Sequence, residues 1–146
     1  LDASRDRLRG YRQALSSHDL SFDPDLVHPG NWEPTSGYEG TLRLMALREP
    51  PDAIFCANDL TAIGVIDALR GEGGLRIPAD VMIAGFDGIP AAAWKGYDLT
   101  TFEQDAEAMV AHAVGIVTAT AATQRSPGEI GITVSPRLIE RGSTGG

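Results

Sequence analysis

The sequence has almost none of the residues on which several protein classes depend. Its 146 residues include a single cysteine, Cys56, and a single lysine, Lys95. One cysteine cannot form a disulfide within the chain, which is compatible with a reducing compartment, so we expect a cytoplasmic protein. Cys56 stands inside an apolar run, where a cysteine usually serves as a small core residue.

Positive charge and long apolar runs are also scarce. The formal net charge is -8 at pH 7, and so acidic a chain repels phosphate backbones and is not expected to bind nucleic acid by itself. No apolar run approaches the ~18 residues that span a bilayer, and residues 1–10 lack the apolar core of a signal peptide, so we expect no membrane partner. The first residue is Leu1 and not methionine, and we expect a piece of a longer protein.

Patterns of catalytic and metal-binding side chains are missing as well. His18, His28 and His112 have no ligand spacing with other histidines, cysteines or carboxylates, so we expect no metal site. The Gly-x-Ser-x-Gly motif and a recognisable Cys/His pair are absent. The GEGG run at residues 71–74 follows a predicted helix, whereas a phosphate-binding loop precedes one. The sequence therefore favours a protein that is not an enzyme and holds no cofactor.

The most informative stretch is PDAIFCANDLTAIGVIDALRGEGG, residues 51–74. It predicts a strand over residues 53–57, buried on both faces, then a polar pair, and then an amphipathic helix that begins at Asp59. A second apolar run, residues 81–86, ends at Asp87. Two parallel strands that each carry a polar group at the carboxyl end are how open α/β sheets form a ligand crevice.

Three further elements are predicted before this stretch. A helix over residues 4–17 begins with Ser4 as its N-cap, a short strand follows over residues 26–28, and a second helix starts at Pro34. The apolar stripe of this second helix would consist of Tyr38, Leu42, Met45 and Ala46. The alternation of helices and strands predicts an α/β fold, a mostly parallel sheet in a three-layer α/β/α arrangement.

The second half of the chain is less regular. Residues 100–102 are short and extended, and residues 105–123 form a long helix that is apolar on most of its circumference and must therefore be buried. Residues 130–134 and 137–139 alternate like strands. Residues 143–146 are expected to be a frayed tail.

The polar residues at the two strand ends are the first candidates for a binding site. Asn58 offers donors and an acceptor and Asp87 offers acceptors, a combination that suits the hydroxyls of a sugar or a nucleoside. A charged group at the mouth of a buried strand is costly unless it is paired or meets a ligand. Asp59 is interpreted as the helix cap, while Asn58 would face the crevice.

Three other side chains have two interpretations each. The planar fork of Arg7 could hold ligand hydroxyls or a carboxylate, although an arginine on an amphipathic helix is usually solvated. Trp32 is either a plug on the core or a stacking platform for a sugar ring. Trp94 is either a packing residue or part of an interface.

Seven blocks of the sequence, taken in order, resemble the LacI/GalR family of bacterial transcription regulators over residues 4–144. The blocks are RDRLRGYRQAL, GNW, TSGYEG, PDAIFCANDLTAIGVIDAL, IPADVMIAGFDGIP, LTTFEQD and PRLIERGST. The resemblance implies a fold like a type I periplasmic sugar-binding protein, in which two α/β subdomains are joined by three crossing strands and hold an effector between them. It also implies a helix-turn-helix DNA-binding region, which is absent from this chain.

The resemblance divides the chain into four parts. Residues 1–104 would form the C-terminal effector-binding subdomain and end in one crossing strand. Residues 105–128 would be a helix and turn of the truncated N-terminal subdomain. Residues 129–142 would return to the C-terminal subdomain, and residues 143–146 would be the tail. An apolar helix without its own subdomain should pack on a second copy of the chain or be disordered.

The resemblance also implies roles for individual residues. The ligand-binding residues would be Arg7, Trp32, Asn58, Asp87 and Gln104. The homodimer interface would include Ile63, Ile66, Asp67, Arg70 and Trp94. This chain has Gly88 where the family commonly has a second aspartate, and we expect that glycine to make the loop freer.

The first hypothesis for function is therefore the effector-binding and dimerisation domain of a LacI-type regulator. It would sense a small polar ligand, expected to be a sugar, and control DNA binding allosterically through the absent region. The second hypothesis is the solute-binding receptor of a sugar transporter with the same fold, and the third is an α/β enzyme of flavodoxin-like topology. The identity of the effector, the choice between induction and co-repression, and the operator stay open.

Overall fold

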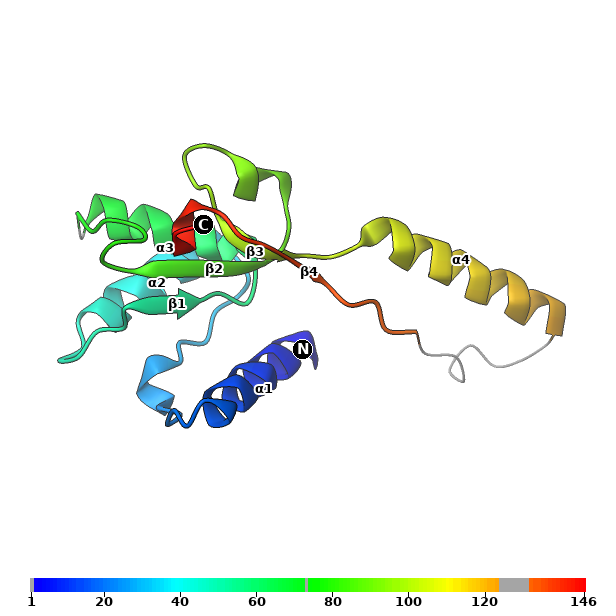
Figure 1. The fold of residues 1–146 in the computed structure, drawn as a ribbon, viewed down its shortest axis with the longest axis horizontal. Coiled ribbons are helices and arrows are strands. Elements are labelled where there is room, and N and C mark those ends of the chain that lie inside the picture. The colour runs from blue at the N-terminus through cyan, green and yellow to red at the C-terminus, as the bar shows by residue number, and fades with distance from the viewer. Residues whose placement is uncertain (1, 73, 124–131) are drawn as a thin grey trace.

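The computed structural model describes residues 2–72, 74–123 and 132–146. The helices of three or more turns and the strands are α1 (Asp2–Ser17), α2 (Pro34–Met45), β1 (Ala53–Phe55), α3 (Asp59–Gly71), β2 (Met82–Asp87), β3 (Thr100–Glu103), α4 (Ala106–Thr123) and β4 (Arg137–Ile139). The strands form one sheet in the order β1-β2-β3-β4 (Figure 1). The first two pairs are parallel and β3 pairs with β4 antiparallel, so the predicted α/β class with a mostly parallel sheet is confirmed.

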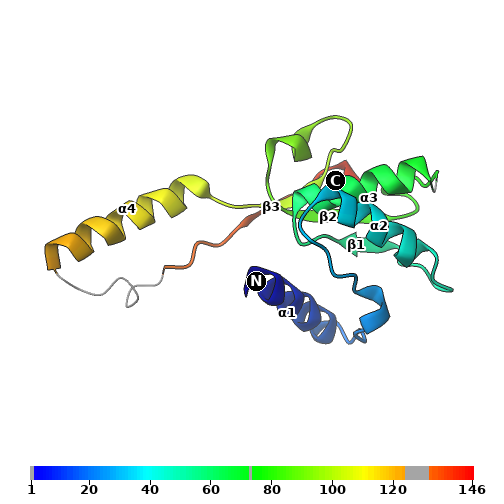
Figure 2. The ribbon, with the colours of Figure 1, turned by 180° about the vertical axis from the view of Figure 1, so that it is seen from behind.

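Helices α2 and α3 pack together over one face of the sheet (Figures 1 and 2). Between α3 and the sheet lies an apolar core that includes Ile66, Leu69, Ile83 and Leu99, all nearly inaccessible to solvent. This core holds β2 and β3 in place, and the ends of these two strands carry the candidate ligand residues.

The face of α2 that meets α3 only partly matches the predicted apolar stripe. Leu42 is 45% exposed, whereas Gly37, Gly40 and Thr41 are buried. A Cβ atom on Gly37 would collide with the carbonyl oxygen of Thr61 in α3, so the helices approach closely because this residue has no side chain. Met45 of the predicted stripe does pack against the core, so hydrophobicity alone identified only part of the buried face of α2.

The predicted strand over residues 26–28 is wrong. Pro24–Leu26 is a single 3-10 turn, which starts where the side chain of Asp23 accepts a hydrogen bond of 2.9 Å from the backbone N–H of Asp25. Proline suits the first position of such a turn and a carboxylate suits its cap. Helix α1 also begins earlier than predicted, so Ser4 lies inside it and is not its N-cap.

Because residues 26–28 do not form a strand, β1 is at the edge of the described sheet. It is shorter than predicted, ending at Phe55, and it is not buried on both faces, because Phe55 is 40% exposed. Strand β2 lies one residue further along the chain than predicted and so includes Asp87.

The end of the chain is not a frayed tail. Ser143 is 1% exposed; its hydroxyl donates to the carbonyl oxygen of Ile83 in β2 at 2.6 Å and accepts from the backbone N–H of Thr100 in β3 at 2.8 Å. The guanidinium of Arg141 donates to the carbonyl oxygen of Leu99 at 2.7 Å. The prediction failed because a small polar residue near a terminus carries no local sign that it completes hydrogen bonds between two strands.

Helix α4 extends away from the sheet (Figures 1 and 2). Over residues 106–118 most of its side chains are exposed, including Met109, Val110, Val114 and Val117 at 46–67%, so the described residues do not provide the burial that the apolar sequence requires. No helix in the described ranges is long and apolar enough to cross a membrane. Of the predicted strand over residues 130–134, residues 130 and 131 lie outside the described residues and the other three are not in a strand.

Candidate functional site

Three of the five predicted ligand residues form one polar cluster beyond the carboxyl ends of β2 and β3. Asp87, the last residue of β2, accepts a hydrogen bond of 2.7 Å at Oδ1 from Nε2 of Gln104. The same oxygen lies 3.3 Å from Nη2 of Arg7, which comes from α1. Three segments of the chain therefore meet at a single carboxylate, at the edge of the sheet where open α/β folds bind ligands.

The guanidinium of Arg7 lies between two aromatic rings. Its Cζ atom is 3.9 Å from the centre of the Phe86 ring and 5.3 Å from the centre of the Trp32 ring. A second nitrogen of Arg7 donates to the carbonyl oxygen of Ala57 at the end of β1. Cation–π contacts favour such a position, and the Arg7 side chain is only 16% exposed. Arg7 is thus held in place before any ligand arrives, and Trp32 supports it.

The fifth predicted residue, Asn58, is the N-cap of α3. Its Oδ1 accepts a hydrogen bond of 3.1 Å from the backbone N–H of Thr61, and its Nδ2 donates to the carbonyl oxygen of Trp32 at 3.0 Å. Asparagine is a strong N-cap residue because its side-chain oxygen satisfies a free N–H of the first turn. The prediction that Asp59 caps the helix is therefore wrong. Asn58 fixes the loop that carries Trp32.

Asp59 connects α3 to the loop that follows Asp87. The Asp59 side chain is completely buried. Its Oδ2 accepts hydrogen bonds from the backbone N–H groups of Gly88 at 2.8 Å and Ile89 at 2.9 Å. Its Oδ1 accepts a hydrogen bond from the hydroxyl of Thr101 at 2.6 Å. Burial raises the pKa of the Asp59 carboxyl above its ordinary value, although these three hydrogen bonds act in the opposite direction.

Gly85 in β2 makes room for this buried carboxylate, because a Cβ atom there would collide with Oδ1 of Asp59. Asp59 and Gly85 together fix the backbone next to the candidate ligand residue. The sequence analysis did not identify this role.

The loop after β2 is tightly held. Asp87 has φ of 119° and Gly88 has φ of 74°, in a region that side chains disfavour. A Cβ atom on Gly88 would lie 2.7 Å from the Cα atom of Glu103. The expectation that Gly88 makes the loop freer is therefore wrong, because the missing side chain lets the loop pack against β3. Backbone strain at Asp87 is typical of a residue that the surrounding structure positions for a function.

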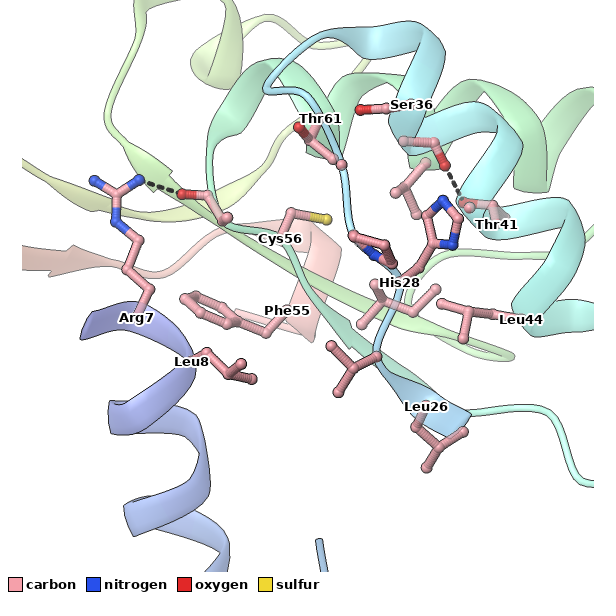
Figure 3. A pocket seen from close by; sticks show the side chains of 18 of the residues that line it. Arg7, Leu8, Leu26, His28, Ser36, Thr41, Leu44, Phe55, Cys56 and Thr61 are labelled. Atoms are coloured by element: carbon pink, nitrogen blue, oxygen red, sulfur yellow. Dashed lines mark hydrogen bonds between the residues drawn. The ribbon is translucent and has the colours of Figure 1, made fainter. Parts of the chain in front are cut away.

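A hollow of about 340 Å³ opens beside this cluster, between α1 and β1 (Figure 3). Arg7 and Trp32 are among its lining residues, and Leu8, Leu26 and Phe55 belong to its apolar lining. Cys56 also lines the hollow, and burial raises the pKa of its thiol to about 12, so this cysteine is not a nucleophile at neutral pH. Within the described residues, no three His, Cys, Asp or Glu side chains gather in a way that could hold a metal ion.

Of the five residues predicted for a dimer interface, four are accessible to solvent and one is not. Trp94 is 61% exposed and Asp67 and Arg70 are exposed too, while Ile63 is half-buried. Ile66 is 0% exposed and packs in the chain's own core, so it is not available to a partner. The prediction failed for this residue because Ile66 lies at the inner edge of that helix face, where α3 packs on the sheet.

Phe86 is a further residue of the site. It stacks on Phe102, with ring centres 5.7 Å apart. Its other contact, with the Arg7 guanidinium, joins two segments 79 residues apart in the sequence. An aromatic residue directly before the predicted ligand carboxylate was the available signal.

The similarities to known proteins agree with this geometry. A family model described as the periplasmic binding protein-like domain matches residues 1–144. The chain is 38% identical over 114 residues to the HTH-type transcriptional repressor PurR of Pasteurella multocida, a match that covers 78% of this chain and 34% of that repressor. The crystal structure of a LacI transcriptional regulator from a Rhodococcus species matches with a TM-score of 0.86 and 31% identity, over 97% of this chain and 51% of that chain.

A second solved structure, the Escherichia coli transcriptional repressor ascG, matches with a TM-score of 0.82 and 33% identity, over 96% of this chain and 50% of that chain. The chain therefore belongs to the periplasmic binding protein-like domain family and, within it, to the LacI-type transcriptional regulators. These relatives are repressors and not enzymes, which favours the regulator hypothesis over both the transport receptor and the flavodoxin-like enzyme. The chain spans about half the length of the solved relatives and about a third of the PurR relative.

Proposed function

We propose that this chain forms one wall of the effector cleft of a LacI-type regulator and that the effector is a small polar molecule, a sugar. The observation that carries the proposal is the cluster of Arg7, Asp87 and Gln104 at the carboxyl edge of the sheet. Within this proposal the intact protein is a cytoplasmic homodimer that binds DNA through a helix-turn-helix region outside this chain.

The cluster has the chemistry to bind vicinal hydroxyls. A carboxylate has about four acceptor positions, so Asp87 can accept from ligand hydroxyls while it holds Arg7 and Gln104. Arg7 presents several N–H donors in a fixed plane, and such a fork can donate to two neighbouring oxygens at once. Trp32 and Phe86 keep the guanidinium in this position, so little side-chain freedom is lost when the ligand binds.

Gln104 supplies a route from the ligand to the rest of the regulator. It follows β3 directly and stands just before α4, and its side chain and backbone N–H both donate to Asp87, at 2.7 Å and 3.3 Å. We propose that residues 105–128 belong to the opposing subdomain, an assignment supported by the projection of α4 away from the sheet (Figure 1). A ligand that closes the cleft on Asp87 would then move the two subdomains relative to each other. DNA binding is regulated in this way if the ligand binds the two arrangements of the subdomains with different affinity.

The experiment that tests this proposal is calorimetry of the full-length gene product with a panel of pentoses, hexoses and nucleosides. A saturable sugar titration, weakened roughly tenfold or more in Asp87→Asn and unchanged in Asp80→Asn, would support the proposal. The operator is found by selecting DNA from random duplexes, and titrations with this DNA then show whether the same sugar changes operator affinity. Binding of no sugar, or an affinity that Asp87→Asn leaves unchanged, would contradict the sugar assignment.

A further inference from the structure

The hollow between α1 and β1 is a second feature that can take part of a ligand. Its volume, about 340 Å³, is within the range of small-molecule sites, roughly 300–1,000 Å³. One wall is the face of α1 that carries Leu8, and the opposite wall is the edge strand β1 with Phe55 (Figure 3). Phe55 is 40% exposed, and no described strand pairs with this edge of the sheet.

Two of the hydroxyl groups in the lining are bonded within the chain. The hydroxyl of Thr41 donates to the carbonyl oxygen of Gly37 at 2.8 Å, and the hydroxyl of Ser36 donates to the carbonyl oxygen of Glu33 at 2.9 Å. These two hydroxyl groups therefore do not need a ligand as their hydrogen-bond acceptor. With Leu8, Leu26, Leu44 and Phe55 around it, the body of the hollow suits an apolar group.

The hollow and the polar cluster share two residues. Arg7 and Trp32 are among the lining residues of the hollow, and Arg7 also contacts Asp87 at 3.3 Å. A single ligand can therefore have its hydroxyls at Asp87 and a substituent that passes Arg7 into the apolar space. A free monosaccharide would fill only the polar half of this combined site.

We propose that the hollow binds an apolar group of about the size of a phenyl ring, and that the effector carries such a group on its polar part, as an aryl or alkyl glycoside does. The second statement rests on the proposed function of the polar cluster. The first rests on the hollow alone.

The first test compares matched pairs of methyl and phenyl glycosides by calorimetry on the full-length gene product. Burial of a phenyl ring predicts roughly tenfold or tighter binding of the phenyl compound. Ala53→Phe places a ring into the hollow from β1 and should remove this preference while leaving methyl glycoside binding unchanged. Ala79→Phe, at an exposed alanine that does not line the hollow, is the matched control. Equal affinities, or a preference that survives Ala53→Phe, would overturn the proposal.

The second test does not depend on sugar recognition. Fluorine NMR of 4-fluorobenzyl alcohol should show line broadening with the protein and with Ala79→Phe, and no broadening with Ala53→Phe. Leu8→Trp fills the hollow from α1 and replaces Ala53→Phe if that variant does not fold. Absence of binding by this probe would overturn the proposal whatever the sugars do. Binding of the probe without binding of any glycoside would support the hollow and contradict the sugar effector.

Discussion

Gln104 donates a hydrogen bond of 2.7 Å to Oδ1 of Asp87, and its backbone N–H donates to the carbonyl oxygen of the same residue at 3.3 Å. The two residues are thus joined through both side chain and backbone. Asp87 ends β2 and Gln104 follows β3, the last strand before α4. The candidate ligand carboxylate is therefore connected directly to the segment that leaves the sheet.

Asp87→Asn should weaken effector binding by roughly tenfold to a hundredfold, because charge-assisted hydrogen bonds contribute about 1.5–3 kcal/mol. The substitution keeps the shape of the side chain and removes the charge that Arg7 contacts. Calorimetry with the sugar that binds best measures the change. Asp80→Asn is the matched control, since Asp80 also holds an arginine, Arg76, at 2.7 Å and 2.9 Å but away from the cluster. An equal loss in both variants would contradict a specific role for Asp87.

Asp59→Ala should destabilise the fold by at least about 3 kcal/mol, because three buried donors lose their acceptor and each costs roughly 1–3 kcal/mol. The donors are the N–H groups of Gly88 and Ile89 and the hydroxyl of Thr101. Asp59→Asn keeps one acceptor oxygen and should cost less. Urea unfolding followed by circular dichroism measures both, and a loss below about 1 kcal/mol in the alanine variant would contradict this account.

Asp59 should also make stability depend on pH. Its pKa in the folded protein is raised, chiefly by burial, so folding favours the protonated form. The stabilisation from this group is complete below the unfolded-state pKa, about 3.9, and is lost as the pH rises through the folded-state pKa. Urea unfolding at a series of pH values should therefore show a smaller decrease with rising pH in Asp59→Asn than in the natural sequence. If the free energy of unfolding changed with pH by the same amount in Asp59→Asn and in the natural sequence, the prediction would be refuted.

Gly64→Ala should destabilise the packing of α2 on α3 by about 1–3 kcal/mol, the usual cost of overpacking. A Cβ atom at this position would collide with the carbonyl oxygen of Pro34, which is backbone and cannot rotate away. Gly71→Ala, at the end of the same helix, has no atom within 4 Å of the added carbon and should be neutral or stabilise by up to roughly 1 kcal/mol. Urea unfolding of the two variants side by side measures the difference, and equal effects would contradict the close approach.

The 146-residue chain by itself should associate through α4. This helix exposes Val110 at 63% and Val117 at 67%, and apolar surface on this scale favours burial against a second copy. Light scattering after size exclusion should give a dimer that Val110→Glu with Val117→Glu converts to a monomer. Arg48→Glu, at a fully solvated position outside the helix, should leave the dimer intact. A monodisperse monomer with α4 solvated would contradict the prediction.

The isolated chain should bind the effector much more weakly than the full-length gene product, because it would supply only one wall of the cleft. Calorimetry of the two proteins with the same sugar measures this difference. Micromolar affinity of the 146-residue chain for a monosaccharide would contradict the expectation that tight binding needs a second wall of the cleft.

Local patterns predicted most of the elements. Pro34 begins a helix as its residue type suggests, and residues 81–86 predict β2 to within one residue. The interpretation failed where two neighbours suit the same local role. Asn58 and Asp59 are both good N-caps, and only the fold shows that the Asp59 carboxylate is committed to Gly88 and Ile89 instead.

The sequence by itself determined the α/β class, and its residue pattern pointed to Asp87 at a strand end, while the resemblance to the LacI/GalR family added Arg7, Trp32 and Gln104. The tertiary structure decided how these side chains meet, with Arg7 between two rings and Asp87 shared by two donors. It also decided that Ser143 is buried. The physical reason is that hydrogen bonds and cation–π contacts between segments far apart in sequence depend on angles and distances that only the folded sheet sets.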